Sequence, residues 1–181
     1  MRNRMLVLLA LVAVLAVLVA APVNADVEKP INGKIELTFV LFDCPEPAPG
    51  PFITWTGTVV IDGTTYGWAD FPTDEFVIEG NFGFFEEYWT IFTLEGDEDP
   101  RDNPLLACDA DRVVLEGVND GWGPATANTG KADGTVTGAD PDGPFAEVAP
   151  GSRMFWRGKI LGNELFPGVQ FKATLHISPL K

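Results

Sequence analysis

Hydrophobic and polar residues alternate along most of the chain after its first 25 residues. In residues 34–42 the side chains of Ile35, Leu37, Phe39 and Leu41 fall on one face, and polar residues fall on the other. A period of two is typical of a strand with one buried face. The same period recurs clearly in 52–61, 153–161 and 169–177, and more weakly in 64–70, 84–94, 111–118 and 131–138. No segment after residue 25 has a sustained helical stripe.

About eight antiparallel strands in one domain predict either a closed β-barrel or a two-sheet β-sandwich. Two strands each place a tryptophan two residues before a glycine on the same face, Trp55 with Gly57 and Trp156 with Gly158. Glycine at such a position lets a strand bend or leaves room for a ring, as barrel closure requires. We therefore predict a single-domain antiparallel β-barrel over residues 26–181, with the sandwich as the alternative.

The most aromatic stretch, FGFFEEYWTIFTL at 82–94, contains two adjacent glutamates. In a regular strand Glu86 and Glu87 point to opposite faces, so one of them faces the core, where an unpaired carboxylate is costly. A bulge at this point would turn both glutamates outward. Alternatively, the strand is regular and the inner glutamate meets an arginine or water, or the stretch is not a single strand. Both strand interpretations leave Trp89 and Ile91 on the face away from the core.

Tryptophan beside carboxylate is chemistry that a sugar ring can use, since the ring stacks on the indole and its hydroxyls bond the carboxylate. This pattern makes Glu86, Glu87 and Trp89 candidate ligand-binding residues. Trp68 and Trp122 join them because both lie near predicted turns, where the mouth of a barrel would be. Alternatively, Trp89 and Ile91 bind no ligand, because a loop or a second subunit covers their face. Cover by a second subunit would make that face a self-association surface.

The N-terminus has the features of a secretory signal peptide. Arg2 and Arg4 precede an apolar run over 5–21, and small residues before Asp26 suit cleavage after Ala25. We predict a signal peptide at 1–25 and a secreted or extracytoplasmic domain, periplasmic or cell-surface location included. A retained N-terminal anchor is the alternative, because the run is close to the shortest length that spans a bilayer.

The chain is strongly acidic. Its formal charge is −14, and loss of Arg2 and Arg4 with the signal peptide would make it −16. Such a charge repels phosphate backbones and anionic headgroups, so neither nucleic acid nor, after signal removal, a membrane surface is expected as a partner.

Two cysteines, Cys44 and Cys108, are the only ones in the chain. In an oxidising compartment an even pair predicts a disulfide, and two free thiols are the alternative. The cysteines are far apart in sequence and the chain has one histidine, so a zinc site of the usual type is not expected.

Catalytic motifs of the GxSxG, HExxH and P-loop types are absent from the sequence, and no cofactor is expected. The single histidine, His176, alternates with an apolar row and is predicted to point outward. Asp97, Asp99 and Asp102 are weak candidates for calcium ligands, and a solvated acidic loop is the preferred explanation of these residues.

These observations predict a secreted β-barrel that binds a small apolar molecule or a glycan. A barrel-type isomerase or hydrolase that uses carboxylates is one alternative, and a structural or self-associating envelope or matrix component is another. An enzyme should bring polar groups together in a recess with a buried carboxylate, whereas a structural protein should have a filled barrel.

Overall fold

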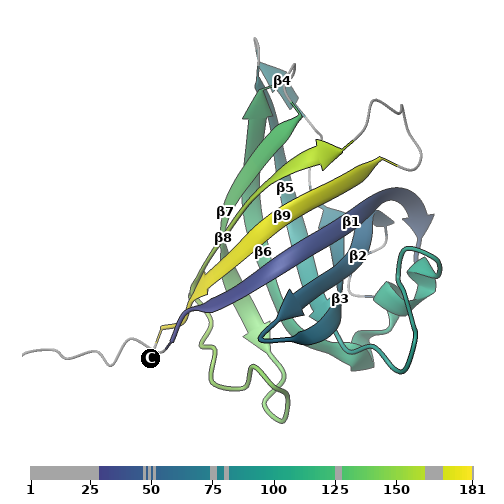
Figure 1. The fold of residues 1–181 in the computed structure, drawn as a ribbon, viewed down its shortest axis with the longest axis vertical. Coiled ribbons are helices and arrows are strands. Elements are labelled where there is room, and N and C mark those ends of the chain that lie inside the picture. The colour runs from purple at the N-terminus through teal and green to yellow at the C-terminus, as the bar shows by residue number, and fades with distance from the viewer. Residues whose placement is uncertain are drawn as a thin grey trace, which may run out of the picture.

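The chain forms a closed antiparallel β-barrel of eight strands (Figure 1). The computed structural model describes residues 29–46, 48, 50, 52–73, 77–79, 82–124, 128–161 and 169–180. The predicted signal peptide therefore lies outside the described residues. The elements are β1 (Ile31–Asp43), β2 (Phe52–Ile61), β3 (Thr64–Pro72), β4 (Val77–Glu79), β5 (Phe82–Phe92), η1 (Pro104–Cys108), η2 (Ala110–Arg112), β6 (Val113–Pro124), β7 (Thr129–Ala139), β8 (Arg153–Leu161) and β9 (Gln170–Ser178).

Most neighbouring strands of the barrel are also neighbours in sequence. The sheet runs β3-β2-β1-β9-β8-β7-β6-β5, and pairing of β3 with β5 closes it. The short strand β4 pairs only with the first residues of β5 and stands beside the barrel wall. The predicted barrel and its eight predicted strands are confirmed, and the sandwich alternative is wrong.

Alternate residues of each strand fill the barrel interior. Ile35, Val59, Leu115, Met154 and Leu175 represent five strands in one buried cluster, and each is at most 2 % exposed. The burial of this row stabilises the fold through the hydrophobic effect, as the period of two in the sequence predicts.

A second apolar cluster lies outside the barrel wall, on β2, β3 and β5. Ile53, Phe71 and Phe92 are covered there by residues of the η1 helix. The disulfide between Cys44 and Cys108, whose Cα atoms are 5.4 Å apart, ties this cover to the end of β1. The predicted disulfide is confirmed, and it indicates an oxidising environment outside the cytoplasm.

The end of β1 departs from the predicted pattern. The register between β1 and β2 shifts between Phe39 and Phe42, so Leu41 is 66 % exposed instead of facing the core. The same irregularity accompanies the placement of Ile53 in the outer cluster rather than in the barrel interior. Simple alternation fails at a bulge because one extra residue reverses the faces that follow.

Candidate functional site

Strand β5 is regular through its two glutamates. Glu86 pairs with Asp120 of β6 and is exposed, whereas Glu87 pairs with Asn119 and faces the barrel interior, where it is 7 % exposed. The predicted bulge at this point is wrong, since the irregularity falls between Ile91 and Phe92. The strand is regular, as the second interpretation held, but the face is reversed: with Trp89 outward the buried glutamate would have been Glu86, whereas the structure buries Glu87. Glu87 meets a second carboxylate rather than an arginine.

Three polar side chains converge inside the barrel. Asp70 of β3, Glu87 of β5 and Asn119 of β6 lie on three consecutive strands and are 4 %, 7 % and 2 % exposed. The register sets Glu87 opposite Pro72 and directly opposite Asn119, so that Asp70 is its diagonal neighbour. Asp70 Oδ1 and both polar atoms of the Asn119 side chain are buried without a hydrogen-bond partner.

Tryptophans surround the carboxyl group of Asp70. Trp55 and Trp89 are its cross-strand neighbours, and Trp68 precedes it by two residues on the same face. The rings of Trp68 and Trp89 stack with centroids 5.3 Å apart and planes at 9°. Their two Nε1 atoms are also buried without partners. Two unpaired donors, the indole N–H groups, and one unpaired acceptor, Asp70 Oδ1, are therefore buried close together among aromatic side chains.

The predicted exposure of these tryptophans is wrong. Trp68 is 1 % exposed, and Trp89 and Ile91 are 0 % exposed. Trp89 and Ile91 belong to the inner cluster because Glu87, Trp89 and Ile91 form the inward row of a regular strand. They consequently offer no outer face for self-association.

Burial changes the acidity of both carboxyl groups. Desolvation raises the pKa of Asp70 from 3.8 to about 7, against a smaller lowering by the nearby Trp68 indole. The indole nitrogen approaches the carboxyl without completing a hydrogen bond of good geometry. Desolvation also raises the pKa of Glu87 well above 4.5, and the charge of Asp70 raises it further. Each carboxyl thus disfavours ionisation of the other, as in other close acid pairs.

A chain of aromatic rings lies next to this polar group. We call it the mouth, and it consists of Phe39, Trp55, Phe85, Trp156 and Phe171. Successive centroids are 5.2 Å apart for Phe39 and Trp55, 5.9 Å for Trp55 and Phe171, 5.2 Å for Phe171 and Trp156, and 5.9 Å for Trp156 and Phe85.

Strand register sets the mouth next to the carboxyl groups. Trp55 is the cross-strand neighbour of Asp70, and Phe85 is the inward residue that precedes Glu87 on β5. Trp55 and Phe85 are half-buried, whereas Trp156 and Phe171 are buried. Glu87 is consequently the carboxyl nearer to the open edge, and Asp70 lies deeper.

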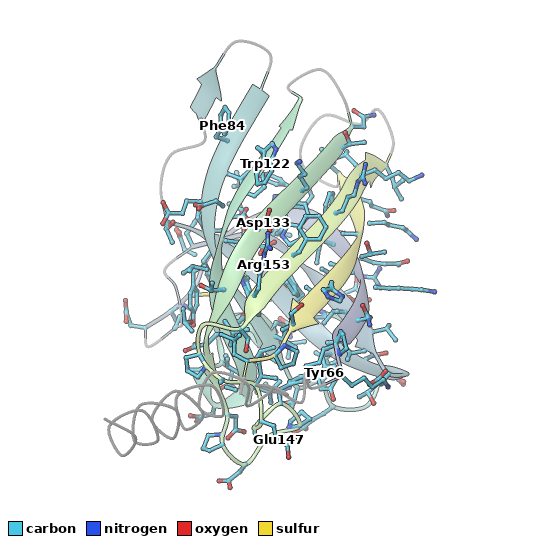
Figure 2. All side chains as sticks on the ribbon, turned by 90° about the vertical axis from the view of Figure 1, so that its left-hand side faces the viewer. Tyr66, Phe84, Trp122, Asp133, Glu147 and Arg153 are labelled. Carbon is cyan, nitrogen blue, oxygen red and sulfur yellow. A yellow bond between two sulfur atoms is a disulfide. The ribbon has the colours of Figure 1, made fainter. Side chains whose placement is uncertain are left out.

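Side chains fill the barrel at the far end from the mouth. Tyr66 packs on Phe145 with ring centroids 5.3 Å apart, and Val148 joins the same buried cluster. Figure 2 shows Tyr66 and Glu147 together at this end, opposite Phe84 and Trp122. A ligand deep in the barrel would compete with these side chains, so the mouth is the better position for a ligand.

The other predicted site residues lie on the outer surface. Trp122 is half-buried, and the Lys131 ammonium sits 4.4 Å from its ring centroid. His176 faces outward as predicted, and its ring nitrogens contact Asn32 and Ser178.

One carboxylate of the acidic loop is paired with an arginine. Asp99 pairs with Arg101, which lowers the pKa of the Asp99 carboxyl, while Asp97 and Asp102 are exposed. Within the described ranges, no group of three or more Asp, Glu, His or Cys side chains is arranged to hold a metal ion.

Two members of the buried polar group, Asp70 and Asn119, were missed by sequence reasoning. Both could have been found from the period of two. Asp70 continues the inward row of Tyr66 and Trp68, and Asn119 lies two residues from Gly117, which is also inward. A polar residue in an inward row is the pattern to search for.

Comparison with known proteins gives no significant match to a family model, a curated protein or a solved structure. None of the helices in the described part of the chain is long and apolar enough to cross a membrane.

Proposed function

We propose that the protein is an exported barrel that binds a small organic molecule at the mouth. The ligand would place an apolar body against the exposed edges of Trp55 and Phe85 and a hydrogen-bonding group on Glu87. The observation that carries this proposal is the convergence of Asp70, Glu87 and Asn119, three buried polar side chains in an otherwise apolar frame. Buried polar groups are nearly always paired, so unpaired ones commonly mark a functional position.

The raised pKa values favour a neutral ligand. A protonated Glu87 donates one hydrogen bond and accepts others, and the Asn119 amide does both. A hydroxyl, carbonyl or neutral amine would match these groups. An apolar pocket with a few convergent polar groups is also the usual form of a small-molecule site.

A fluorescent probe tests this proposal. N-phenyl-1-naphthylamine has an apolar aromatic body and one N–H donor, and its emission rises in apolar surroundings. We expect saturable binding at one site, weakened about tenfold in Glu87→Leu, which removes the hydrogen-bonding group, because a hydrogen bond to a buried polar group is worth about 1.4 kcal/mol.

Glu86→Leu is the matched control. It makes the same change one residue away on the exposed face of β5. Probe affinity should equal that of the unmodified protein in this variant. Equal affinities of Glu87→Leu and Glu86→Leu, with both proteins folded by circular dichroism, would exclude the mouth as the binding site.

Acid–base catalysis at the same carboxyl groups is the second candidate function. The observation that favours it is the pKa of Asp70, about 7, beside a second carboxyl whose pKa is also raised. A carboxyl with a pKa near neutrality, coupled to a second carboxyl whose pKa is also raised, suits general acid and base roles. A panel of p-nitrophenyl glycosides and esters tests this candidate. Turnover that disappears in Asp70→Asn supports it, and turnover unaffected by that change contradicts it.

A further inference from the structure

Basic side chains gather on one outer face of this acidic protein. Six of the twelve Lys and Arg residues lie on β1, β7, β8 and β9, although the formal net charge of the chain is −14. On β8 the residues Arg153, Arg157 and Lys159 are all exposed. The negative charge is therefore unevenly distributed, and the net charge alone does not describe this face.

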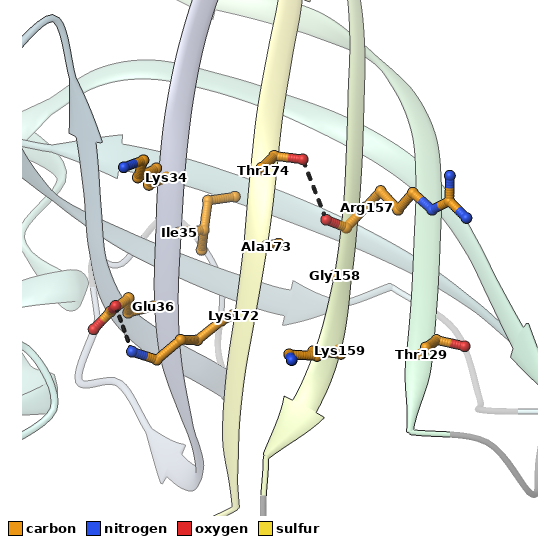
Figure 3. Close-up of a pocket in the computed structure, with 10 residues that line it drawn as sticks. All are labelled: Lys34, Ile35, Glu36, Thr129, Arg157, Gly158, Lys159, Lys172, Ala173 and Thr174. Carbon is orange, nitrogen blue, oxygen red and sulfur yellow. Dashed lines mark hydrogen bonds and ion pairs between the residues drawn. The ribbon is translucent and has the colours of Figure 1, made fainter.

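A shallow hollow of about 450 Å³ lies among these basic residues (Figure 3). Backbone of Ile35, Gly158 and Ala173 contributes to its lining, since the side chains at these positions are absent, small or turned inward. Side chains from adjacent strands surround it, namely Lys34, Glu36, Arg157, Lys159, Lys172 and Thr174. The hollow is thus bordered mainly by cations.

Strand register places like charges directly opposite each other. Lys159 pairs with Lys172 across β8 and β9, and Lys131 pairs with Arg157 across β7 and β8. Such pairs destabilise a sheet unless a counter-charge lies between them. Glu36 neutralises Lys172 at 2.6 Å.

Three cations at the hollow lack this kind of compensation. Within the described segments, Lys34, Arg157 and Lys159 have no carboxylate at ion-pair distance. The sheet therefore keeps uncompensated positive charge around a concave surface. An anionic ligand would remove this repulsion.

An aromatic pair continues the basic face toward β5. Cross-strand pairing links one outer row in the order Phe84, Trp122, Lys131, Arg157, Thr174, Lys34. The row crosses six strands, an arc of about 24 Å at the usual spacing between strands. Phe84 is 40 % exposed, and Figure 2 shows it beside Trp122 near one end of the barrel.

A row of carboxylates runs beside the aromatic part of this face. Glu86, Asp120 and Asp133 face one another across β5, β6 and β7, and only Asp133 has an arginine partner, Arg153. A densely charged polyanion such as nucleic acid or an anionic bilayer would meet this row and be repelled. A chain with spaced charges and many hydroxyl groups would not, because free carboxylates accept hydroxyl hydrogen bonds.

We propose that the outer face of β6, β7, β8, β9 and β1 binds an acidic polysaccharide. Anionic groups of the polysaccharide occupy the hollow between Arg157, Lys159 and Lys172. A sugar ring stacks on the face of Trp122 that Lys131 does not cover, and neighbouring hydroxyls bond Asp120. This site is separate from the mouth, because its side chains point away from the barrel interior.

The test measures binding of immobilised protein to polygalacturonate, chondroitin sulfate and neutral dextran. We expect polygalacturonate to bind, dextran not to bind, and affinity to fall about tenfold between 50 and 300 mM salt, because the distance over which exposed charges act shrinks from about 14 Å to about 6 Å over this range. Chondroitin sulfate distinguishes the anion, since stronger binding of this polymer assigns the hollow to sulfate rather than carboxylate.

Two variants and one control locate the site. Lys159→Gln should weaken polygalacturonate about threefold and reduce the salt dependence, as loss of an exposed interface charge does. Trp122→Ala should weaken it about tenfold with the salt dependence unchanged, because stacking on an aromatic ring is a contact of about 1.4 kcal/mol and is not ionic. Lys29→Gln removes one exposed positive charge outside the hollow and should change nothing.

Three results would overturn the proposal. They are equal binding by the Lys159→Gln and Lys29→Gln proteins, binding of duplex DNA or phosphatidylglycerol vesicles as strong as that of polygalacturonate, and no binding of either acidic polymer at 50 mM salt. All substituted residues except Trp122 are exposed, so circular dichroism needs to confirm folding chiefly for Trp122→Ala.

Discussion

Replacement of Asp70 by asparagine should stabilise the protein at alkaline pH and not at acid pH. Desolvation raises the pKa of Asp70 from 3.8 to about 7 in the folded state. The folded protein therefore binds more protons than the unfolded chain between these values. The stability that comes from proton binding by Asp70 is fully present below about pH 4 and is lost as pH rises through about 7.

The size of this effect follows from the pKa change. A rise of about three pKa units corresponds to about 4 kcal/mol, which is an upper limit on the loss of stability at pH 8. An asparagine at this position stays polar and buried, so part of the free-energy cost of burying a polar group remains. We expect Asp70→Asn to raise the free energy of unfolding at pH 8 by about 2 kcal/mol, roughly half of that limit. At pH 4 the change should be within about 0.5 kcal/mol of zero, as for a substitution without a charge effect.

Urea unfolding followed by tryptophan fluorescence from pH 4 to pH 8 measures this difference. Glu86→Gln serves as the control because it removes an equal charge from the outer face of β5, on the opposite side of the barrel wall from the site. That variant reports the general effect of the negative net charge, which also lowers stability as pH rises. Parallel stability curves for Asp70→Asn and the unmodified protein would refute the reasoning.

Two further predictions concern the barrel and its cover. Joint replacement of Cys44 and Cys108 by alanine should lower the free energy of unfolding by about 4 kcal/mol in the chain-entropy model, measured by urea unfolding without reductant, and an unchanged midpoint would contradict this. Gly121→Ala should cost about 2 kcal/mol, because an added Cβ would lie 1.8 Å from the Phe85 ring. Gly130→Ala on the next strand meets only ordinary contacts at 3.6 Å and should be tolerated, so equal losses in the two variants would exclude ring crowding as the cause.

Much of the fold could be predicted from alternation alone. Inward residues such as Ile35, Val59 and Leu175 follow the period of two, because one sheet face is dry and the other is wet. The prediction failed where register changes, as at Leu41. A bulge depends on pairing with another strand, and a single strand's sequence does not encode that directly.

The candidate site was predicted only in part. A regular strand was expected to bury one of the two glutamates, but the pattern of β5 pointed to Glu86 rather than Glu87, and the neighbours of Glu87 could not be found from β5 alone. Asp70 lies 17 residues earlier, and closure of the barrel through pairing of β3 with β5 brings it beside Glu87. The expectation of an exposed Trp89 failed for the same reason, because the choice of inner face requires the whole barrel.

The outer basic face shows a limit of reasoning from net charge. A value of −14 disfavours anionic partners on average, yet strand register gathers Arg157, Lys159 and Lys172 on one surface. Position within the sheet, rather than composition, decides what such a surface can bind.

Two carboxyl groups, those of Asp70 and Glu87, share the dry interior beneath the mouth. Their titration can be followed by ¹³C NMR of the side-chain carboxyl carbons, in the unmodified protein and in Asp70→Asn. We predict one resonance with an apparent pKa of about 7 that is missing from the variant, and a second, from Glu87, that also titrates well above its usual range. Titration of every carboxyl below about pH 5, as exposed groups do, would contradict it.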